Sequence, residues 1–397
     1  MPDSLEHIPI VMQGLPKWDS PYEATSFHIA KGLSKNRDVF YVEHPFTWKD
    51  YVKKRNSPQI ERRKSATTAQ PFTLYKNLTY IYAPFIPPFN FLPDGTIYRT
   101  SRRFANERIW KRVKNILQEH DVDHFIYINS FDPVFNLTKY FCDPVLSIYI
   151  CYDWMDSNPY IARHGVREER KIIKQSDFVV CTSKPLKEHA LKFNANSYFI
   201  GNAVNVNHFL KSDDDIPEDY KPIKRPVILF LGNIDNRLDY ELILRTAKAN
   251  PTLEFVFVGP IQKTAAELKA SKQKNIRLLG PVSYNDVPRY IKNAAICWIP
   301  FRKSPQTKHI YPLKLHEYLA CGKPVITTDF TNLVEFTDVV HIVETETAIE
   351  ESVFKQLLTD SSKNRQQRIN VAKNNTWAKR LEKWNSLINR YLEKKLI

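Results

Sequence analysis

Residues 310–330 read IYPLKLHEYLACGKPVITTDF, the clearest local pattern in the chain. A helix is expected to begin just after Pro312 and to end at Gly322, which precedes a second proline and an apolar strand. Lys314 and Glu317 stand one turn apart on one face, near the start of this helix. A cation beside helix-terminal N–H groups suits a diphosphate, and a carboxylate can accept hydrogen bonds from two ribose hydroxyls. The segment therefore predicts either one edge of a nucleotide site or an exposed ion pair on a surface helix.

Short apolar segments alternate with helical patterns on both sides of this stretch. In the second half of the chain, strands are predicted at 227–234, 253–260, 276–282, 296–301 and 324–330, with helices near 240–249, 285–293 and 313–321. In the first half, strands are predicted at 8–12, 38–44, 124–129, 146–153, 177–183 and 197–204, with a helix at 184–193. Near-continuous apolar strands between helices are typical of parallel sheets covered on both faces. The predicted fold class is therefore α/β, with two Rossmann-like βα domains whose sheets face a central cleft.

The chain has 397 residues, enough for two domains of ordinary size. The polar segment 206–225, which ends in KSDDDIPEDYKPIKR, is predicted to be a linker between residues 1–205 and residues 226–375. Residues 376–397 are predicted to form a closing helix, because apolar side chains recur mostly at spacings of three and four, at Trp377, Leu381, Trp384, Leu387, Ile388 and Tyr391.

The formal net charge of +15 exceeds what solubility requires. Fifteen Lys and Arg residues stand against four acidic residues between Lys49 and Lys114, and the same segment contains the run FIPPFNFLP at 85–93. Basic and aromatic residues together are typical of a surface that contacts an anionic membrane, so residues 45–114 are predicted to form a membrane-facing insertion. The alternative is a solvated basic face with ordinary core aromatics. Nucleic acid is not expected as a partner, because no recognition motif accompanies the charge.

The expected location and cofactor content follow from simple patterns. No apolar run approaches the roughly 20 residues that span a bilayer, and the N-terminus lacks the pattern of a secretion signal. We therefore expect a cytoplasmic protein, peripheral at the inner face of the cell membrane. No metal or cofactor is expected, since the five cysteines include no CxxC pair and the three aspartates at 213–215 lie in the predicted linker.

The stretch from Pro312 to Val325 also fits the pattern P-x-K-x-x-E-Y-x-A-x-G-K-P-V. Further segments of the same kind are SDFVVCTSKPL at 176–186, GNAVNVNHF at 201–209, FLGNIDNRLDYELI at 230–243, FVFVGP at 255–260 and LLGPVSYNDVPRYIKNAAICWIPF at 278–301. In these segments the chain resembles the GT-B glycosyltransferases, particularly glycosyltransferase family 4 of the group 1 type. The resemblance implies that an N-terminal domain binds the acceptor and a C-terminal domain binds the donor.

The reaction implied by this resemblance is transfer of a sugar from a UDP- or GDP-linked donor. The acceptor would be a lipid-linked sugar or a surface polysaccharide, and transfer would proceed with retention and without a metal. Two other readings stay open. One is a nucleotide-sugar epimerase of GT-B architecture, and the other is a noncatalytic GT-B binding protein.

The resemblance also implies a set of donor-binding residues. Lys314 and Arg237 would contact the diphosphate, although Arg237 could equally be a surface arginine. His309 stands where many family members have a glutamate, so the role of that glutamate does not carry over to it. The candidate donor-binding residues are Arg237, Gly259, Leu279, His309, Lys314 and Glu317.

The acceptor side is expected in the first half of the chain. The glycine-rich loop of the family is reduced to one glycine here, so the candidate acceptor-side residues are Gly14, Trp18, Asp19 and Ser20. Asp153 and Asp156 follow a predicted strand and are candidate catalytic carboxylates. The alternatives are a strand-end turn for Asp153 and a helix cap for Asp156. If configuration is retained, no dedicated base is needed, and these aspartates would bind substrate.

Overall fold

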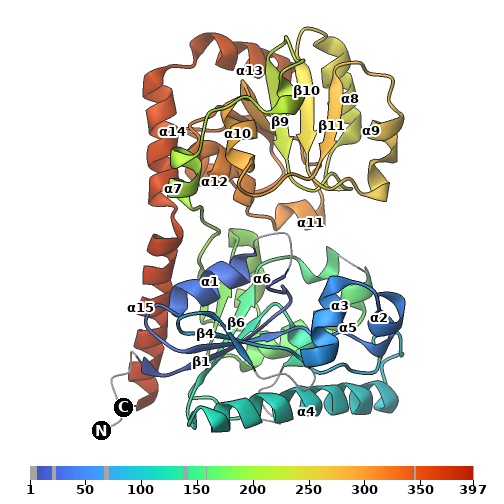
Figure 1. Cartoon of the computed structure of the whole chain (residues 1–397). Coiled ribbons are helices and arrows are strands. Elements are labelled where there is room, and N and C mark those ends of the chain that lie inside the picture. The colour runs from blue at the N-terminus through green and yellow to red at the C-terminus, as the bar shows by residue number, and fades with distance from the viewer. Residues whose placement is uncertain are drawn as a thin grey trace. The chain divides into compact units, whose positions relative to one another are not determined.

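The computed structural model of the chain describes residues 7–19, 24–66, 71–136, 142–157, 159–343 and 346–396. It divides into two compact units (Figure 1). The first unit comprises Met1–Gly201 together with Arg380–Ile397, and the second comprises Asn202–Lys379. Each unit is an α/β structure built on its own sheet, as the alternating pattern of the sequence predicts.

The first unit contains, within its described residues, an eight-stranded sheet in the order β3-β4-β2-β1-β5-β6-β7-β8. Its strands are β1 (Ile10–Gly14), β2 (Val39–Glu43), β3 (Phe72–Tyr75), β4 (Leu78–Ile81), β5 (Ile126–Ser130), β6 (Leu146–Cys151), β7 (Phe178–Cys181) and β8 (Ser197–Phe199). All neighbouring strands are parallel except the β3–β4 pair, which is antiparallel. The helices are α1 (Thr25–Leu33), α2 (Trp48–Lys53), α3 (Pro58–Ala66), α4 (Thr96–Glu119), α5 (Pro159–Gln175), α6 (Lys184–Leu191) and α15 (Trp377–Leu396), with short 3-10 turns η2 (Pro133–Phe135) and η3 (Met155–Ser157).

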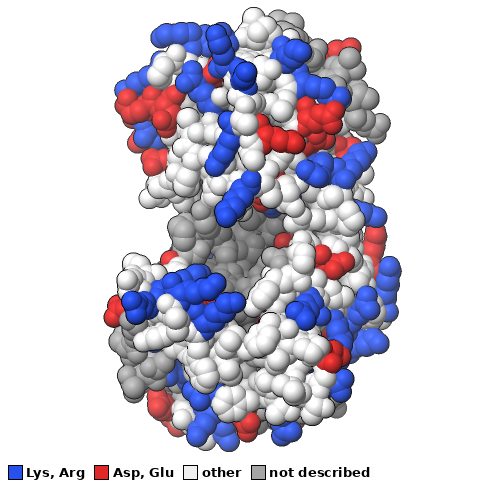
Figure 2. All heavy atoms as spheres, turned by 90° about the vertical axis from the view of Figure 1, so that its right-hand side faces the viewer, with Lys and Arg blue, Asp and Glu red and all other residues white. Residues whose placement is uncertain are grey.

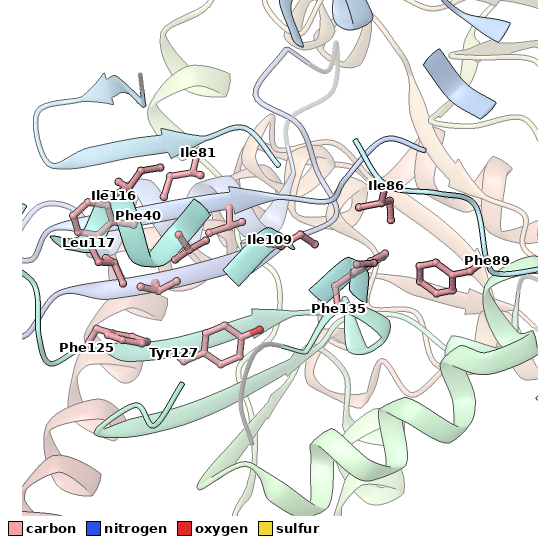
Figure 3. Packing of buried hydrophobic residues seen from close by; sticks show 14 of the residues in the cluster. Phe40, Ile81, Ile86, Phe89, Ile109, Ile116, Leu117, Phe125, Tyr127 and Phe135 are labelled. Atoms are coloured by element: carbon pink, nitrogen blue, oxygen red, sulfur yellow. The ribbon is translucent and has the colours of Figure 1, made fainter. Parts of the chain in front are cut away.

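The long helix α4 covers one face of this sheet (Figure 3). Its side chains Ile109 and Val113 are fully buried against Phe40 of β2, Ile81 of β4 and Tyr127 of β5. Burial of each such side chain stabilises the fold by about 1.5–3 kcal/mol. The prediction that residues 45–114 form an insertion is therefore wrong in part, because β4 extends the sheet and α4 supplies the core. The sequence predicts an insertion here because the many charged residues of α4 make its buried apolar face hard to recognise.

The second unit has a six-stranded parallel sheet in its described residues, in the order β11-β10-β9-β12-β13-β14. Its strands are β9 (Val227–Leu231), β10 (Glu254–Val258), β11 (Ile276–Gly280), β12 (Ile296–Ile299), β13 (Val325–Thr328) and β14 (His341–Val343). Its helices are α7 (Val206–Lys211), α8 (Tyr240–Ala249), α9 (Ala266–Ala270), α10 (Val287–Lys292), α11 (Pro305–Lys308), α12 (Leu313–Ala320), α13 (Glu346–Thr359) and α14 (Ser362–Asn374), with η4 (Glu218–Tyr220), η5 (Lys263–Ala265) and η6 (Val334–Phe336). Because the strands are parallel, their carboxyl ends share one edge, where ligands bind in open α/β sheets.

Residues 206–225 belong to the second unit, so they are not the free linker that their polar composition predicts. Phe209 in α7 and Tyr220 in η4 are buried. Tyr290 of α10 donates a hydrogen bond to Asp219, 2.6 Å away. A few apolar anchors in a polar segment are enough to hold it against the domain.

On the face drawn in Figure 2, the positive charge lies in groups. Figure 2 shows clusters of Lys and Arg side chains separated by uncharged areas, with smaller clusters of Asp and Glu. Within the ranges given above, every helix is too short or too polar to cross a membrane.

Candidate functional site

Two glycines meet backbone to backbone at the carboxyl edge of the second sheet. Gly232 follows β9 and Gly259 follows β10, with φ of 137° and 142°, a region that side-chain-bearing residues rarely adopt. Gly232 N donates to Val258 O at 2.9 Å, and Gly259 N donates to Gly280 O at 2.7 Å. A Cβ added at Gly259 would lie 2.1 Å from Gly232 O. The edge therefore requires glycine at Gly259 and presents bare backbone there.

Lys314 lies directly beside this glycine pair. Its Nζ is 4.0 Å from the centroid of the Phe230 ring and 4.9 Å from that of Phe301. A Cβ added at Gly232 would come within 2.5 Å of the same Nζ. The ammonium group is thus held over the end of β9 by two aromatic faces, which attract a cation through their ring quadrupoles.

Helix α12, which carries Lys314, is tied to β9 by one hydrogen bond. Leu231 N donates to the buried Tyr318 Oη at 2.8 Å. Pro312 is the N-cap residue, and it supplies no side-chain cap to the first turn. Uncapped amides at a helix start favour an anionic ligand. The start of α12 and the Lys314 ammonium therefore form a site suited to phosphate groups.

A second cation lies close to Lys314. Arg237 donates from Nε and Nη2 to the Asp235 carboxylate, at 2.8 Å and 2.7 Å. Its guanidinium also lies 5.6 Å from the centroid of the Phe301 ring that Lys314 contacts. Burial and then the Arg237 charge lower the pKa of Lys314 to about 7, although Asp235 and Glu317 act in the opposite direction. The surroundings of Lys314 therefore bring its pKa close to neutral pH.

The other predicted donor residues are Glu317, Leu279 and His309, all in the second unit. Glu317 is half-buried one turn after Lys314 on α12, as the helix spacing predicts. Leu279 is half-buried in β11, immediately before Gly280, whose carbonyl binds Gly259. His309 follows α11, and its Nδ1 lies 2.6 Å from Pro305 O. The contacts of the structure join Gly259, Lys314 and Arg237 through Gly232 and Phe301.

The predicted acceptor-side residues have mainly internal contacts. Gly14 ends β1, and a Cβ there would lie 2.6 Å from Tyr41 Oη. Trp18 Nε1 donates to Tyr82 Oη at 3.3 Å. Ser20 lies outside the described residues.

Asp19 is part of a buried ion cluster that sequence reasoning missed. The buried Arg63 of α3 donates to Asp19 at 2.9 Å and to Glu43 at 2.6 Å. Tyr80 Oη donates to the same Glu43 carboxylate at 2.7 Å. Burial raises the pKa of Asp19, but the hydrogen bonds and charge of Arg63 outweigh it, so the pKa lies below its ordinary value. The cluster fixes the loop after β1 to α3.

The two candidate catalytic aspartates follow β6, at the carboxyl edge of the first sheet. The Asp153 carboxylate accepts a hydrogen bond from Trp154 N at 2.8 Å, the local turn given above as its alternative role. Asp156 is exposed in η3.

A histidine–aspartate pair at this edge was also missed. His44 follows β2 and Asp132 follows β5, the two strands that flank β1. His44 Nδ1 lies 2.9 Å from Asp132 Oδ2, and the side chains are 35% and 3% exposed. Asp132 N donates to Asn129 Oδ1 at 2.9 Å, and Phe131 has a φ of 58°, a strained value for a bulky residue. The backbone is thus held in the conformation that presents Asp132 to His44.

This pair lines a cavity of about 290 Å³ within the first unit. The walls are mostly apolar, and the lining residues are Leu15, His44, Pro45, Thr47, Ile86, Phe89, Asn90, Phe131, Asp132, Pro133, Val134, Phe135, Tyr160 and Ile161. An apolar cavity with a few convergent polar groups is the usual form of a small-molecule site.

Two α/β units on mainly parallel sheets, with the chain returning from the second unit to the first within α15, fit the GT-B class. Solved GT-B structures are similar over nearly the whole chain. Sucrose-phosphate synthase from Thermosynechococcus elongatus has a TM-score of 0.69 at 14% identity, covering 98% of this chain and 100% of that one. Anabaena HepE, in complex with UDP-glucose, has a TM-score of 0.66 at 11% identity, covering 97% and 100%. The fold of this chain is therefore GT-B.

Within this class, residues 225–357 match the family described as glycosyl transferases group 1. A Bacillus subtilis protein, TuaH, whose name assigns it to teichuronic acid biosynthesis as a glycosyltransferase, is 31% identical over 171 residues. That match covers 41% of this chain and 42% of TuaH, so it spans about two-fifths of the relative's length. The chain thus has the GT-B fold, and its residues 225–357 are similar to the group 1 glycosyltransferases.

Proposed function

We propose that this chain transfers a sugar from a nucleotide-sugar donor to an acceptor hydroxyl in the synthesis of a cell-envelope polymer. The observation that carries the proposal is the Lys314 ammonium group, held over Gly232 at the carboxyl edge of the second sheet beside the uncapped start of α12. Such a constellation favours the diphosphate of a nucleotide sugar, because fixed cations and amides need no reorganisation as the leaving group gains charge.

In this proposal the donor lies along the edge formed by β9, β10 and β11. Lys314 and Arg237 contact the diphosphate, and Glu317 accepts hydrogen bonds from the ribose. Bare backbone at Gly259 lets the nucleoside approach closely, next to Leu279. A UDP-linked sugar is the favoured donor, since UDP-glucose occupies the similar Anabaena structure. Transfer proceeds with retention and without a metal, as the family resemblance implies, with the protein cations neutralising the leaving diphosphate.

The acceptor lies in the cavity of the first unit that contains His44 and Asp132. Its apolar walls hold the body of the acceptor, and the His44 imidazole, oriented by Asp132, accepts a hydrogen bond from the reacting hydroxyl. Asp153 and Asp156 remain candidates for further acceptor contacts. A lipid-linked saccharide or a surface polysaccharide fits this role. The name of TuaH, which refers to teichuronic acid biosynthesis, supports the same class of product. The chain would then act at the cytoplasmic face of an anionic membrane.

Thermal shifts of the full chain with UDP, GDP, ADP and their sugar conjugates, with and without EDTA, test the donor site. A ligand that binds only the folded state raises stability by mass action. We expect a shift for one nucleotide family that EDTA leaves unchanged and that Glu317→Ala abolishes. A shift that requires a divalent metal contradicts the metal-independent mechanism. The absence of any shift contradicts the donor site and favours a noncatalytic protein. An epimerase would convert the sugar nucleotide without acceptor, which NMR of the nucleotide pool detects.

A further inference from the structure

A second cavity, of about 380 Å³, lies in the first unit between α4 and α5. Its lining residues are Arg99, Arg102, Arg103, Asn106, Asn136, Arg167, Glu168 and Lys171. Five of these side chains are cations and one is a carboxylate. The volume falls within the range of roughly 300–1,000 Å³ of small-molecule sites. A cavity with this lining favours an anionic ligand.

Glu168 organises the inner wall of this cavity. Its carboxylate, nearly inaccessible to solvent, forms an ion pair with Arg102 at 2.8 Å and accepts hydrogen bonds from Arg167 at 2.9 Å and Lys171 at 3.0 Å. Burial raises the pKa of Glu168, but the Arg102 charge and the hydrogen bonds of Lys171 and Arg167 hold it below its ordinary value. The carboxylate therefore stays ionised, fixes three cations and neutralises only one positive charge.

Arg99 and Arg103 form the outer rim, one turn apart on α4. Arg99 is 70% exposed and pairs loosely with Asp94, with 3.6 Å between Nε and Oδ1. Arg103 is exposed as well. Exposed ion pairs of this kind contribute about 0–1 kcal/mol, so Arg99 can turn to a stronger anion at little cost. A guanidinium can donate two parallel hydrogen bonds to one phosphate group.

Large apolar side chains stand exposed on the segments that form this cavity. On α4, Ile97 and Phe104 are 72% and 45% exposed, and Phe91, in the loop that leads to α4, is 61% exposed. The same loop is held to α5, because Asp94 pairs with Arg167. Exposed apolar side chains would not contribute to the binding of a soluble anion. Cations beside exposed aromatic and aliphatic side chains suit the interface of an anionic membrane, where the phosphate meets the acyl chains.

The cationic cavity is also a neighbour of the apolar one. Val134 of η2 lines the apolar cavity, and its carbonyl accepts hydrogen bonds from Arg102 at 2.9 Å and Asn106 at 3.2 Å, both of which line the cationic cavity. The two cavities therefore share the η2 segment as a common wall.

We propose that the cavity between α4 and α5 binds the phosphate group of an anionic membrane phospholipid, with Arg99 and Arg103 closing on it and Ile97 and Phe104 entering the interfacial layer. This inference rests on the proposed membrane acceptor, but it concerns a site separate from both the donor edge and the apolar cavity. Such a site would hold the mouth of the apolar cavity at the membrane surface, where a lipid-linked acceptor resides.

Vesicle co-sedimentation of the full chain tests this proposal without donor or acceptor. The probes are vesicles of phosphatidylcholine alone and of phosphatidylcholine mixed with phosphatidylglycerol. The test variant is Arg99→Gln/Arg103→Gln, and the matched control is Lys111→Gln/Lys114→Gln, which removes the same charge from exposed positions of α4 outside the cavity. We expect the wild type to bind only the mixed vesicles, the rim variant to lose on the order of 10-fold or more in affinity, and the control to lose much less. Unchanged Tm values establish that both variants fold.

Three outcomes overturn the proposal. Failure of the wild type to bind mixed vesicles removes the membrane ligand. If the rim variant and the control lose equal amounts of vesicle affinity, the binding comes from diffuse surface charge and not from the cavity. Tight binding of inorganic phosphate or glycerol 3-phosphate in calorimetry, abolished in the rim variant and without vesicle binding, identifies a soluble phosphate as the ligand. Because no nucleotide sugar is present, none of these outcomes depends on the donor site, which the thermal shifts test separately.

Discussion

Donor binding should be coupled to uptake of a proton by the protein, because the pKa of Lys314 lies close to neutral pH. The pKa of Lys314 is about 7, lowered mainly by burial and next by Arg237. At pH 8 roughly 0.9 of these side chains are then uncharged, and at pH 6 roughly 0.1. A diphosphate beside Nζ favours the ammonium form and returns the pKa toward its ordinary range. Binding at pH 8 should therefore take up close to one proton, and binding at pH 6 almost none.

Isothermal calorimetry with UDP-glucose in two buffers of different ionisation enthalpy measures this uptake directly. UDP-glucose is the suitable ligand, because its diphosphate lacks the terminal phosphate that titrates near pH 6 in UDP. Lys314→Met keeps the length of the side chain and removes the titrating group, so it should abolish the uptake and weaken binding on the order of 10-fold or more. The control Lys248→Met changes an exposed lysine of α8 and should leave both quantities unchanged. Equal proton uptake at pH 6 and pH 8, or uptake that persists in Lys314→Met, refutes the reasoning.

The same pKa shift predicts how the stability of the protein without added ligand depends on pH. The folded pKa of Lys314 lies below its ordinary value of 10.5, so the unfolded chain binds more protons between about pH 7 and pH 10.5. Through this residue, stability should rise with pH across that window and be lowest below pH 7. Because Lys314 is only half-buried in the folded chain, the effect should be smaller than the full shift implies. Saturating UDP-glucose should flatten the dependence, which thermal unfolding at several pH values measures.

Three further changes separate the roles proposed for the two units. Glu317→Ala should raise the Kd for UDP-glucose on the order of 10-fold or more by removing the ribose acceptor, and an unchanged Kd in calorimetry would exclude that contact. Gly259→Ala places a Cβ 2.1 Å from Gly232 O at a φ of 142°, so it should destabilise the fold by about 1–3 kcal/mol or more, seen as a lower Tm; an unchanged Tm contradicts the close packing. Asp132→Asn should release His44 and lower sugar incorporation into a membrane-lipid extract roughly 100-fold while the Kd for UDP-glucose stays the same; a weaker Kd instead would move the pair to the donor side.

The second unit follows closely from its sequence. Helix α8 spans Tyr240–Ala249 and α12 begins at Leu313, both as the sequence predicts. Each βα step is encoded locally, since an apolar run, a break and an amphipathic stretch each specify their own element. Lys314 and Glu317 could be predicted for the same reason, because their spacing on one helix is fixed by the helix period. The glycine pair beside Lys314 could not be predicted from the sequence, because Gly232 and Gly259 come together only when β9 and β10 pair.

The first unit was predicted less well, because the many charged residues in the segment 45–114 made its buried strands and helix face hard to recognise. The strands Phe72–Tyr75 and Leu78–Ile81 are short and lie in the most basic part of the chain, and no strand was predicted there. On α4 the buried Tyr98, Ile109 and Val113 alternate with long cations that keep their charged ends in solvent. Counting charges along the segment mixes the exposed and the buried face of α4. The spacing of apolar residues along the helix distinguishes the two faces.

The His44–Asp132 pair shows what sequence could have found and what it could not. Each residue follows a buried strand, VFYVE or IYINS, within two positions, and parallel strands bring such residues to one edge. That rule would have selected His44 and Asp132 for inspection. It would not have paired them, since 88 positions separate them and the pairing depends on the order β2-β1-β5 and on the strained backbone of Phe131.

The arrangement of charge in the second unit bears on how the donor edge would work. Lys314 and Arg237 repel each other, and that repulsion contributes to the low pKa of Lys314. Asp235 holds Arg237 in place through two short hydrogen bonds, so a ligand would not have to order that side chain. A bound diphosphate relieves the repulsion, and it does so more strongly as the bond to the sugar breaks and charge collects on the leaving oxygen. Interactions that strengthen toward the transition state accelerate the reaction, whereas those equally strong in the bound donor do not. A fixed arginine beside a lysine that gains its full charge only when the donor binds is therefore better suited to transfer than to storage of the nucleotide sugar.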